Sequence, residues 1–262
     1  MDRPLNTNFV SKKELNHKHI AFSMARVPGS GHYYHGASDS GVYQVDHGDE
    51  KPEAKRFTAE GHSSYILGTA LNSRHLFTGG WDKNLIWWDR ETGKAVRKQK
   101  AHDKWLRGVE VSPCGKQLAT VSDDMVCRIW STETGSLLAE LKGHEPQTPN
   151  NYPSMLFCAR YSPDGSRLAT GDKVGHVVIW DTESFKPLQT LDAPGHYTWD
   201  PTARRHSIGG LRSIAFSPDG SQMYTGGIHK IGNVDHLAAK ARIEIFDIET
   251  GESFAVLSGS DK

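Results

Sequence analysis

Short apolar segments recur along this chain, and turns rich in Gly, Pro, Ser, Asp and Thr separate them. Four of these segments, LIWWD, CRIWS, VVIWD and IEIFD, end at residues 89, 131, 181 and 247 and are either alternating or wholly apolar. Runs of this length that are rich in β-branched and aromatic residues favour strands, because helices usually need about ten residues or more. The pattern therefore predicts an all-β chain built from many short strands.

The turns and strands follow one another in a fixed order. A Ser-Pro-x-Gly turn occurs at residues 112–115, 162–165 and 217–220, and an apolar pair with a threonine follows each turn. Three threonines are each followed ten residues later by a tryptophan: Thr78 by Trp88, Thr120 by Trp130, and Thr170 by Trp180. Histidines that follow Gly or Ala begin successive units at intervals of forty and forty-two residues: His62, His102 and His144. An internal repeat of this period indicates a repeat architecture.

Four short strands per unit, framed by Gly-His and Trp-Asp signals, resemble the WD40 family of β-propellers. The resemblance places the propeller at residues 17–262, with five repeats at about 17–60, 61–100, 101–142, 143–194 and 195–258. It implies a WD-repeat β-propeller of four-stranded antiparallel blades. Because such propellers most often have seven blades, within a range of about 4–8, five repeats imply an incomplete seven-bladed ring, a five-bladed ring or an open arc. Residues 1–16 are an N-terminal segment that, as in the family, is a candidate ring-closing strand.

The resemblance also implies a hydrogen-bonded chain of one His, one Thr, one Asp and one Trp inside a blade. The matching residues in the second and third repeats are His62, Thr78, Asp82 and Trp88, and His102, Thr120, Asp124 and Trp130. Buried polar groups need partners, which is the physical reason for such a set. A nucleophilic triad has a similar composition, but an enzyme needs one such site, and recurrence in register favours a structural role.

The other repeats depart from this pattern. The fourth repeat keeps three members, His144, Thr170 and Trp180. There Val174 stands at the aspartate position, and Asp172, two residues earlier, is a candidate substitute. The fifth repeat has Phe246 in place of the tryptophan, and the first has Asp39 but no tryptophan. We therefore expect the second and third blades to be the most rigid.

Three connections are longer than the repeat requires, at residues 145–153, 197–208 and 228–240. In an up-and-down blade, the connection into the first strand and the turn between the second and third strands lie at the same end. All three long connections should therefore lie on one face, over the fourth and fifth repeats, where aromatic and arginine side chains favour partner binding. The candidate contact residues on this face are Tyr65, Trp81, Trp105, Tyr152, Tyr197, Trp199, Arg204, Arg205, His229 and Lys230. Alternatively, the long loops pack on one another around Trp199.

The leading hypothesis is a scaffold that binds another protein through this face and has no enzyme activity. The alternative is a ligand-binding or hydrolytic propeller with a polar site at the channel mouth, for which His206, His229 and Asp235 are the candidates. We found no phosphate loop, paired CxxC motif or nucleophile elbow, and the histidine pairs lack a completing acidic or thiolate ligand. We therefore expect no cofactor and no metal.

Charge and composition limit the partners further. Lys plus Arg and Asp plus Glu number 31 each, and without a basic excess we expect no nucleic-acid partner. The chain has no run of about 18 apolar residues and no apolar N-terminal signal, so no membrane association is expected. Three cysteines without close pairing favour a reducing, cytoplasmic location. An open arc would expose unpaired edges and would favour self-association.

Overall fold

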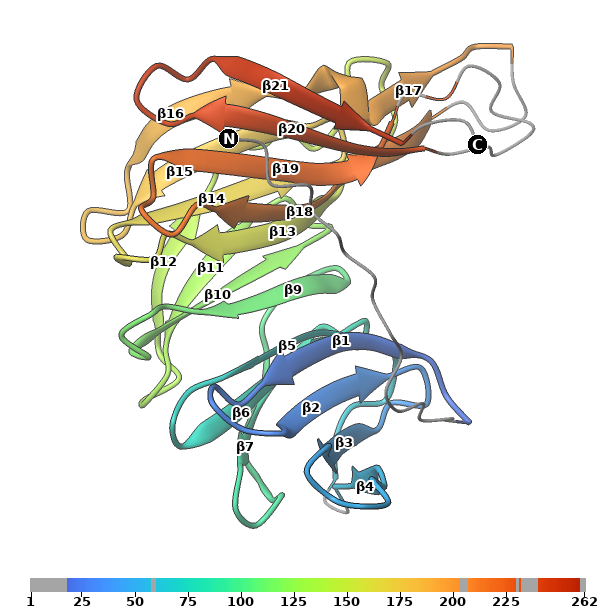
Figure 1. Ribbon diagram of the computed structural model, residues 1–262, viewed down its shortest axis with the longest axis vertical. Coiled ribbons are helices and arrows are strands. Elements are labelled where there is room, and N and C mark those ends of the chain that lie inside the picture. Colours follow the sequence, from blue (N-terminus) through green and yellow to red (C-terminus); the bar gives the residue numbers. More distant parts are fainter. Residues whose placement is uncertain (1–17, 58–59, 203–206, 230, 232–239, 260–262) are drawn as a thin grey trace, which may run out of the picture.

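A computed structural model describes residues 18–57, 60–202, 207–229, 231 and 240–259. These residues form five antiparallel sheets, each made of strands consecutive in sequence (Figure 1). The first three sheets are β1 (Ala21–Arg26), β2 (His32–Ala37), β3 (Val42–Asp46) and β4 (Lys55–Arg56); β5 (Ile66–Leu71), β6 (His75–Gly80), β7 (Asn84–Asp89) and β8 (Ala95–Lys100); and β9 (Leu106–Val111), β10 (Gln117–Ser122), β11 (Cys127–Ser131) and β12 (Leu137–Leu141). The prediction of an all-β fold of four-stranded blades is confirmed.

The last two sheets contain the irregular part of the chain. The fourth consists of β13 (Leu156–Tyr161), β14 (Arg167–Asp172), β15 (His176–Asp181) and β16 (Pro187–Asp192). The fifth consists of β17 (Tyr197–Trp199), β18 (Ser207–Phe216), β19 (Gln222–Ile228), β20 (Ala241–Asp247) and β21 (Ser253–Ser258), and a 3-10 turn, η1 (Pro194–His196), precedes it. The second long connection thus adds β17 as a fifth strand, which pairs with the start of β18.

The sheets follow one another along an arc (Figure 1). The innermost strands β1, β5, β9, β13 and β18 contact their neighbours in this order, from the first sheet to the last. Among the described residues, β1 and β18 make no comparable contact with each other, and Figure 1 shows the first and fifth sheets at opposite ends of the arc. The described part of the chain is therefore an open arc of five blades.

The hydrophobic core is divided into four clusters, one between each pair of neighbouring sheets. In the second blade, Ile86 and Trp88 pack toward the first blade, whereas Leu85 and Trp87 pack toward the third. Both faces of the middle strands are therefore buried, which explains why a segment such as LIWWD is apolar throughout. Because each blade is held by its neighbours, the first and fifth blades each pack against a single blade among the described residues.

Candidate partner-binding face

The second and third blades contain the complete polar set. Trp88 Nε1 donates to Thr78 Oγ1 at 2.8 Å, and the same hydroxyl lies 2.8 Å from His62 Nε2. His62 Nδ1 lies 2.9 Å from an oxygen of Asp82, so the chain runs from indole to carboxylate without a gap. In the third blade the corresponding contacts join Trp130, Thr120, His102 and Asp124 at 2.9, 2.8 and 3.0 Å. Fully paired and mostly buried, these groups are structural elements of the blade.

The fourth blade builds the same chain from a different aspartate. Trp180 Nε1 donates to Thr170 Oγ1 at 2.9 Å, His144 Nε2 lies 2.8 Å from that oxygen, and His144 Nδ1 lies 3.0 Å from Asp172. In the second blade, Gly80 occupies the position of Asp172, and a Cβ built on Gly80 would lie 3.1 Å from His62 Nδ1. An acidic side chain at this place therefore points at the histidine, so Asp172 supplies the carboxylate that Val174 lacks.

The first and fifth blades carry reduced or altered sets. Within the described part of the fifth blade, the set is limited to the contact between His196 Nε2 and Thr225 Oγ1 at 3.1 Å, and Phe246 packs in the core. In the first blade, His35 stands at the threonine position and its Nε2 lies 3.0 Å from His19 Nε2. Histidine ring contacts thus replace the tryptophan hydrogen bond in the first blade.

The connections between blades, together with the turns between second and third strands, form one side of the arc, which we call the loop face. On this face, Trp81 and Trp105 from the second and third blades stack with ring centroids 4.1 Å apart and an interplanar angle of 9°. Tyr65 extends the stack at 4.9 Å from Trp81, and Phe22 lies 5.4 Å from Tyr65. Trp105 keeps 43% of its surface exposed. These four side chains form an aromatic ladder across three blades.

A half-buried cation supports this ladder. The guanidinium carbon of Arg107 lies 5.5 Å from the centroid of Trp81 and 5.3 Å from that of Trp105, within cation–π range. Asp123 accepts two hydrogen bonds from Arg107, at 2.8 Å from Nε and 2.7 Å from Nη2. A bidentate pair of this kind fixes the orientation of the guanidinium plane. The fold itself therefore holds the ladder in a fixed geometry.

A repeated β-bulge aims side chains at the loop face. Each innermost strand skips one residue in its pairing with the next strand, near the start of β1, β5, β9 and β13 and in the middle of β18. The skipped residues in chain order are Phe22, Leu67, Arg107, Phe157 and Arg212. Bulges redirect side chains next to functional sites. The same backbone irregularity thus brings four of these residues, Phe22, Arg107, Phe157 and Arg212, toward the loop-face end of the channel.

The long connections form a second cluster. Tyr152 and Trp199, both half-buried, lie with ring centroids 5.0 Å apart and join the first two long loops. The backbone amide of buried Ile231, in the third long loop, donates to Thr198 Oγ1 at 2.7 Å. The three loops therefore pack on one another, as the alternative hypothesis stated for Trp199. Tyr197 and His229 are half-buried beside them, whereas Arg204, Arg205 and Lys230 lie outside the described residues.

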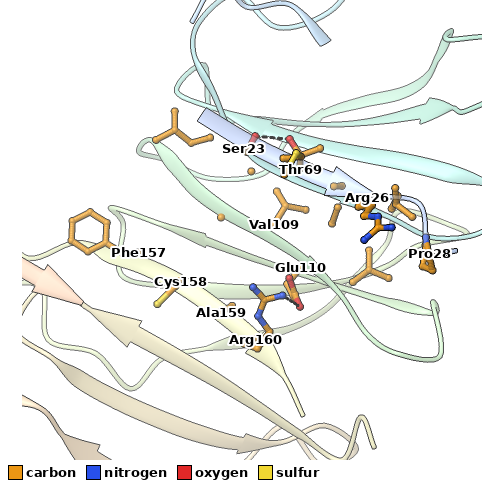
Figure 2. A pocket seen from close by; sticks show the side chains of 18 residues that line it. Ser23, Arg26, Pro28, Thr69, Val109, Glu110, Phe157, Cys158, Ala159 and Arg160 are labelled. Carbon is orange, nitrogen blue, oxygen red and sulfur yellow. Dashed lines mark hydrogen bonds and ion pairs between the residues drawn. The ribbon is translucent and has the colours of Figure 1, made fainter. Parts of the chain in front are cut away.

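The channel side of the arc contains an open hollow of about 440 Å³, lined by β1, β5, β9 and β13. Figure 2 shows Phe157 at one end of its wall and Arg26 and Pro28 at the other, with the Glu110–Arg160 ion pair between them. This pair measures 2.8 Å, and although Arg160 acts against it, burial raises the pKa of Glu110. Two candidates for a polar site at the channel mouth, His206 and Asp235, lie outside the described residues. That alternative stays a prediction.

Comparison with known proteins assigns the repeats. The sequence model of the family described as "WD domain, G-beta repeat" matches residues 54–89, 93–131 and 135–181. The chain is a WD-repeat protein. The three matches cover the β-strands that carry the complete Thr-to-Trp hydrogen bonds, in the second, third and fourth blades.

Curated relatives carry related repeats. Nuclear distribution protein PAC1 of Arthroderma benhamiae is 28% identical over 192 residues, which cover 68% of this WD-repeat protein and 38% of the relative. The guanine nucleotide-binding protein subunit beta of Oryza sativa subsp. japonica is 26% identical, with 63% and 42% covered. WD repeat-containing protein VIP3 of Arabidopsis thaliana is 26% identical, with 63% and 49% covered. The match spans less than half the length of each relative. Within the residues that the structure describes, no helical segment has the length and hydrophobicity of a membrane span.

Sequence reasoning did not single out four residues that the structure places on this face of the WD-repeat protein: Phe22, Arg107, Phe157 and Arg212. One sequence signal was available, because the four residues share one place in the repeat. Each directly follows the residue that aligns with the first residue of β5. The periodicity of a strand predicts alternating sides, and a bulge interrupts that alternation. Their convergence on one end of the channel therefore depended on the bulge, which apolar patterning does not reveal.

Proposed function

We propose that this WD-repeat protein is a non-enzymatic scaffold that binds another protein through its loop face. The observation that carries the proposal is the stacked Trp81–Trp105 pair, because its outer member is well exposed although the pair is held rigidly by Arg107. Tryptophan and arginine are the residue types most enriched in interface hot spots. A rigid aromatic anchor loses little conformational entropy on binding, so its burial contributes most of its hydrophobic free energy to affinity.

The proposed surface extends beyond the fourth and fifth blades. The sequence placed it there because of the long loops, and the Tyr152–Trp199 contact lies among those loops. The aromatic ladder lies over the first three blades. The two clusters define two candidate anchor regions, and we assign the main role to the ladder, because its outer tryptophan is exposed whereas Trp199 is half-buried.

Affinity purification with mass spectrometry, comparing variants, tests this proposal. We expect Trp105→Ala to remove specific partners that the unaltered chain recovers, and Trp199→Ala to leave them bound. Leu138→Ala is the matched control, because Leu138 is similarly exposed but lies on the outer strand β12. Partners lost with Trp105→Ala are then tested as purified proteins by calorimetry. The proposal is wrong if W105A and L138A recover the same partners.

The end of the arc supports a second, separate proposal of self-association. Leu257 on β21 is 57% exposed, whereas Leu141 and Leu191, at the corresponding places of the third and fourth blades, are 2% and 3% exposed. Those two leucines are covered by the next blade, and the fifth blade has no next blade among the described residues. An apolar blade face without a cover favours association with another chain.

We also propose a cytoplasmic location, because the three cysteines lack close pairing in the sequence, which favours a reducing compartment.

A further inference from the structure

Positive charge gathers around Phe157 at the loop-face end of the channel. The guanidinium carbon of Arg212, from the fifth blade, lies 4.0 Å from the centroid of Phe157, and that of Arg107, from the third blade, lies 5.7 Å from it. The turn that carries Lys173 belongs to the fourth blade, directly after β14. Three successive blades thus contribute cations to the surroundings of one aromatic ring, and we call Arg107, Lys173 and Arg212 the basic cluster.

The basic cluster is not neutralised from within. Asp123 pairs with Arg107, which leaves Lys173 and Arg212 without an ion pair among the described residues. The hydrogen bond of the Arg212 side chain runs to the backbone oxygen of Gly209 at 3.3 Å. Burial and the Arg107 cation lower the pKa of Arg212, and burial and the Arg212 cation lower the pKa of Lys173. Burial is the larger cause of both shifts, repulsion by a neighbouring cation adds to it, and Asp123 acts against it only at Lys173, so an incoming anion would stabilise the charged forms of Lys173 and Arg212.

Glycines make this close arrangement of backbones feasible. Gly209 and Gly210, at the start of β18, have φ angles of 106° and 128°, a region that side chains with a Cβ rarely adopt. A Cβ built on Gly210 would lie 3.1 Å from Phe157 Cε2 and 3.3 Å from the backbone oxygen of Lys173. The two glycines thus allow the fifth blade to approach the ring and the Lys173 turn. The backbone therefore helps to fix how close the residues of the basic cluster lie to one another.

We propose that the basic cluster binds carboxylate side chains of an acidic segment in a partner protein, which enters the channel mouth beside Trp105. This inference rests on the proposed function and adds the chemistry of the partner to it. Arg212 and Lys173 each offer free donors, and a guanidinium binds a carboxylate through two parallel hydrogen bonds. The neighbouring aromatic ladder accommodates an apolar or aromatic side chain of the same segment. The recognised feature is therefore an Asp or Glu close to a large apolar residue.

Two observations favour a protein carboxylate over a nucleic-acid backbone. Asp123 remains in the middle of the cluster, where it would repel a continuous row of phosphates but tolerates one or two carboxylates. The whole chain has 31 basic and 31 acidic residues, so it provides no long-range attraction for a polyanion. The local excess of two cations matches a short acidic segment.

Selection from a random dodecapeptide library displayed on phage tests the inference with the full chain as bait. We expect the selected peptides to be enriched in Asp and Glu next to aromatic residues. The strongest peptide is then synthesised with a fluorophore and titrated by fluorescence anisotropy. We expect the double variant Lys173→Gln/Arg212→Gln to weaken its binding at least about tenfold, the effect of losing one charge-assisted hydrogen bond, and added salt to weaken binding to the unaltered chain.

Controls separate this inference from the proposed function. Arg74→Gln and Lys116→Gln remove exposed cations from turns on the opposite side of the arc and should leave binding unchanged. Peptides that depend on Trp105 but lack acidic residues, or acidic peptides that bind the double variant equally well, would overturn the inference and retain the proposed function. A single-stranded DNA oligonucleotide that binds as tightly as the peptide would also overturn it. If no selected peptide depends on Trp105, both proposals fail.

Discussion

Replacement of Asp172 by alanine tests whether this carboxylate completes the hydrogen-bonded chain of the fourth blade. The carboxylate accepts hydrogen bonds from three donors, each at 3.0 Å: His144 Nδ1 and the backbone amides of Val174 and His176. Its side chain is 3% exposed and that of His144 is fully buried. Alanine would leave these donors without their acceptor inside the blade.

The cost follows from the number of donors. A buried donor left without a partner costs about 1–3 kcal/mol, and the two backbone amides lie in a half-buried turn that water partly reaches. We therefore expect Asp172→Ala to lower the free energy of unfolding by ~3–5 kcal/mol, similar to the loss of one partner from a buried ion pair. Asp192 is the matched control: it contacts His176 Nδ1 at 2.8 Å, but its side chain is 74% exposed. Asp192→Ala should cost less than about 1 kcal/mol.

Urea unfolding followed by tryptophan fluorescence measures both variants, with the free energy extrapolated linearly to water. A third variant, Asp172→Ala/Val174→Asp, moves the carboxylate to the place it has in the second and third blades. We expect most of the stability to return, because the turn has the same left-handed residue: φ is 87° at Gly175, 69° at Lys83 and 65° at Met125. If D172A costs no more than D192A, the assignment of Asp172 to the polar set is wrong.

Three further predictions concern acid stability, thiol reactivity and association. Burial acts to raise the pKa of Asp82, but the His62 hydrogen bond and charge lower it overall, from its ordinary 3.8 to about 2. The ionised carboxyl therefore stabilises the fold above pH 4 by about 2 kcal/mol. In acid unfolding of the unaltered chain this contribution should be lost between pH 4 and 2, whereas Asp82→Asn should show no such loss. Ellman's reagent should modify one thiol rapidly in the native chain and three in denaturant. Cys114 is exposed and its Ser112 hydrogen bond lowers its pKa, whereas burial raises the pKa of Cys127 and raises that of Cys158 to about 12. Three thiols that react equally fast in the native chain would contradict these environments. Leu257→Glu should shift the chain toward the monomer in size-exclusion chromatography with light scattering, and a wild-type chain that is already monomeric at all concentrations would refute self-association through this blade face.

Particular residues show where sequence reasoning succeeded. Thr78 and Trp88 lie ten residues apart on adjacent antiparallel strands, so local register brings them together, and the hydrogen bond between them is the one that the family resemblance implied. The role of Asp172 was ambiguous in sequence, because Asp172 is the last residue of β14, whereas Asp82 and Asp124 lie two residues later, in the turns after β6 and β10. The structure resolved it through the space above the equivalent Gly80, which is a property of the folded turn. Local contacts were therefore predictable, and substitutions for them were not.

The amino-acid sequence by itself determined the blades: the strands, their order and the pairing partners within each sheet. These features depend on residues within about forty positions, and the periodicity of apolar side chains encodes them directly. Only the tertiary structure decided which side chains of different blades meet, such as Trp81 with Trp105 or Arg107 and Arg212 around Phe157. Those meetings depend on the β-bulges and on the angle at which one sheet packs on the next, and both arise from the packing of whole sheets, which no local pattern contains.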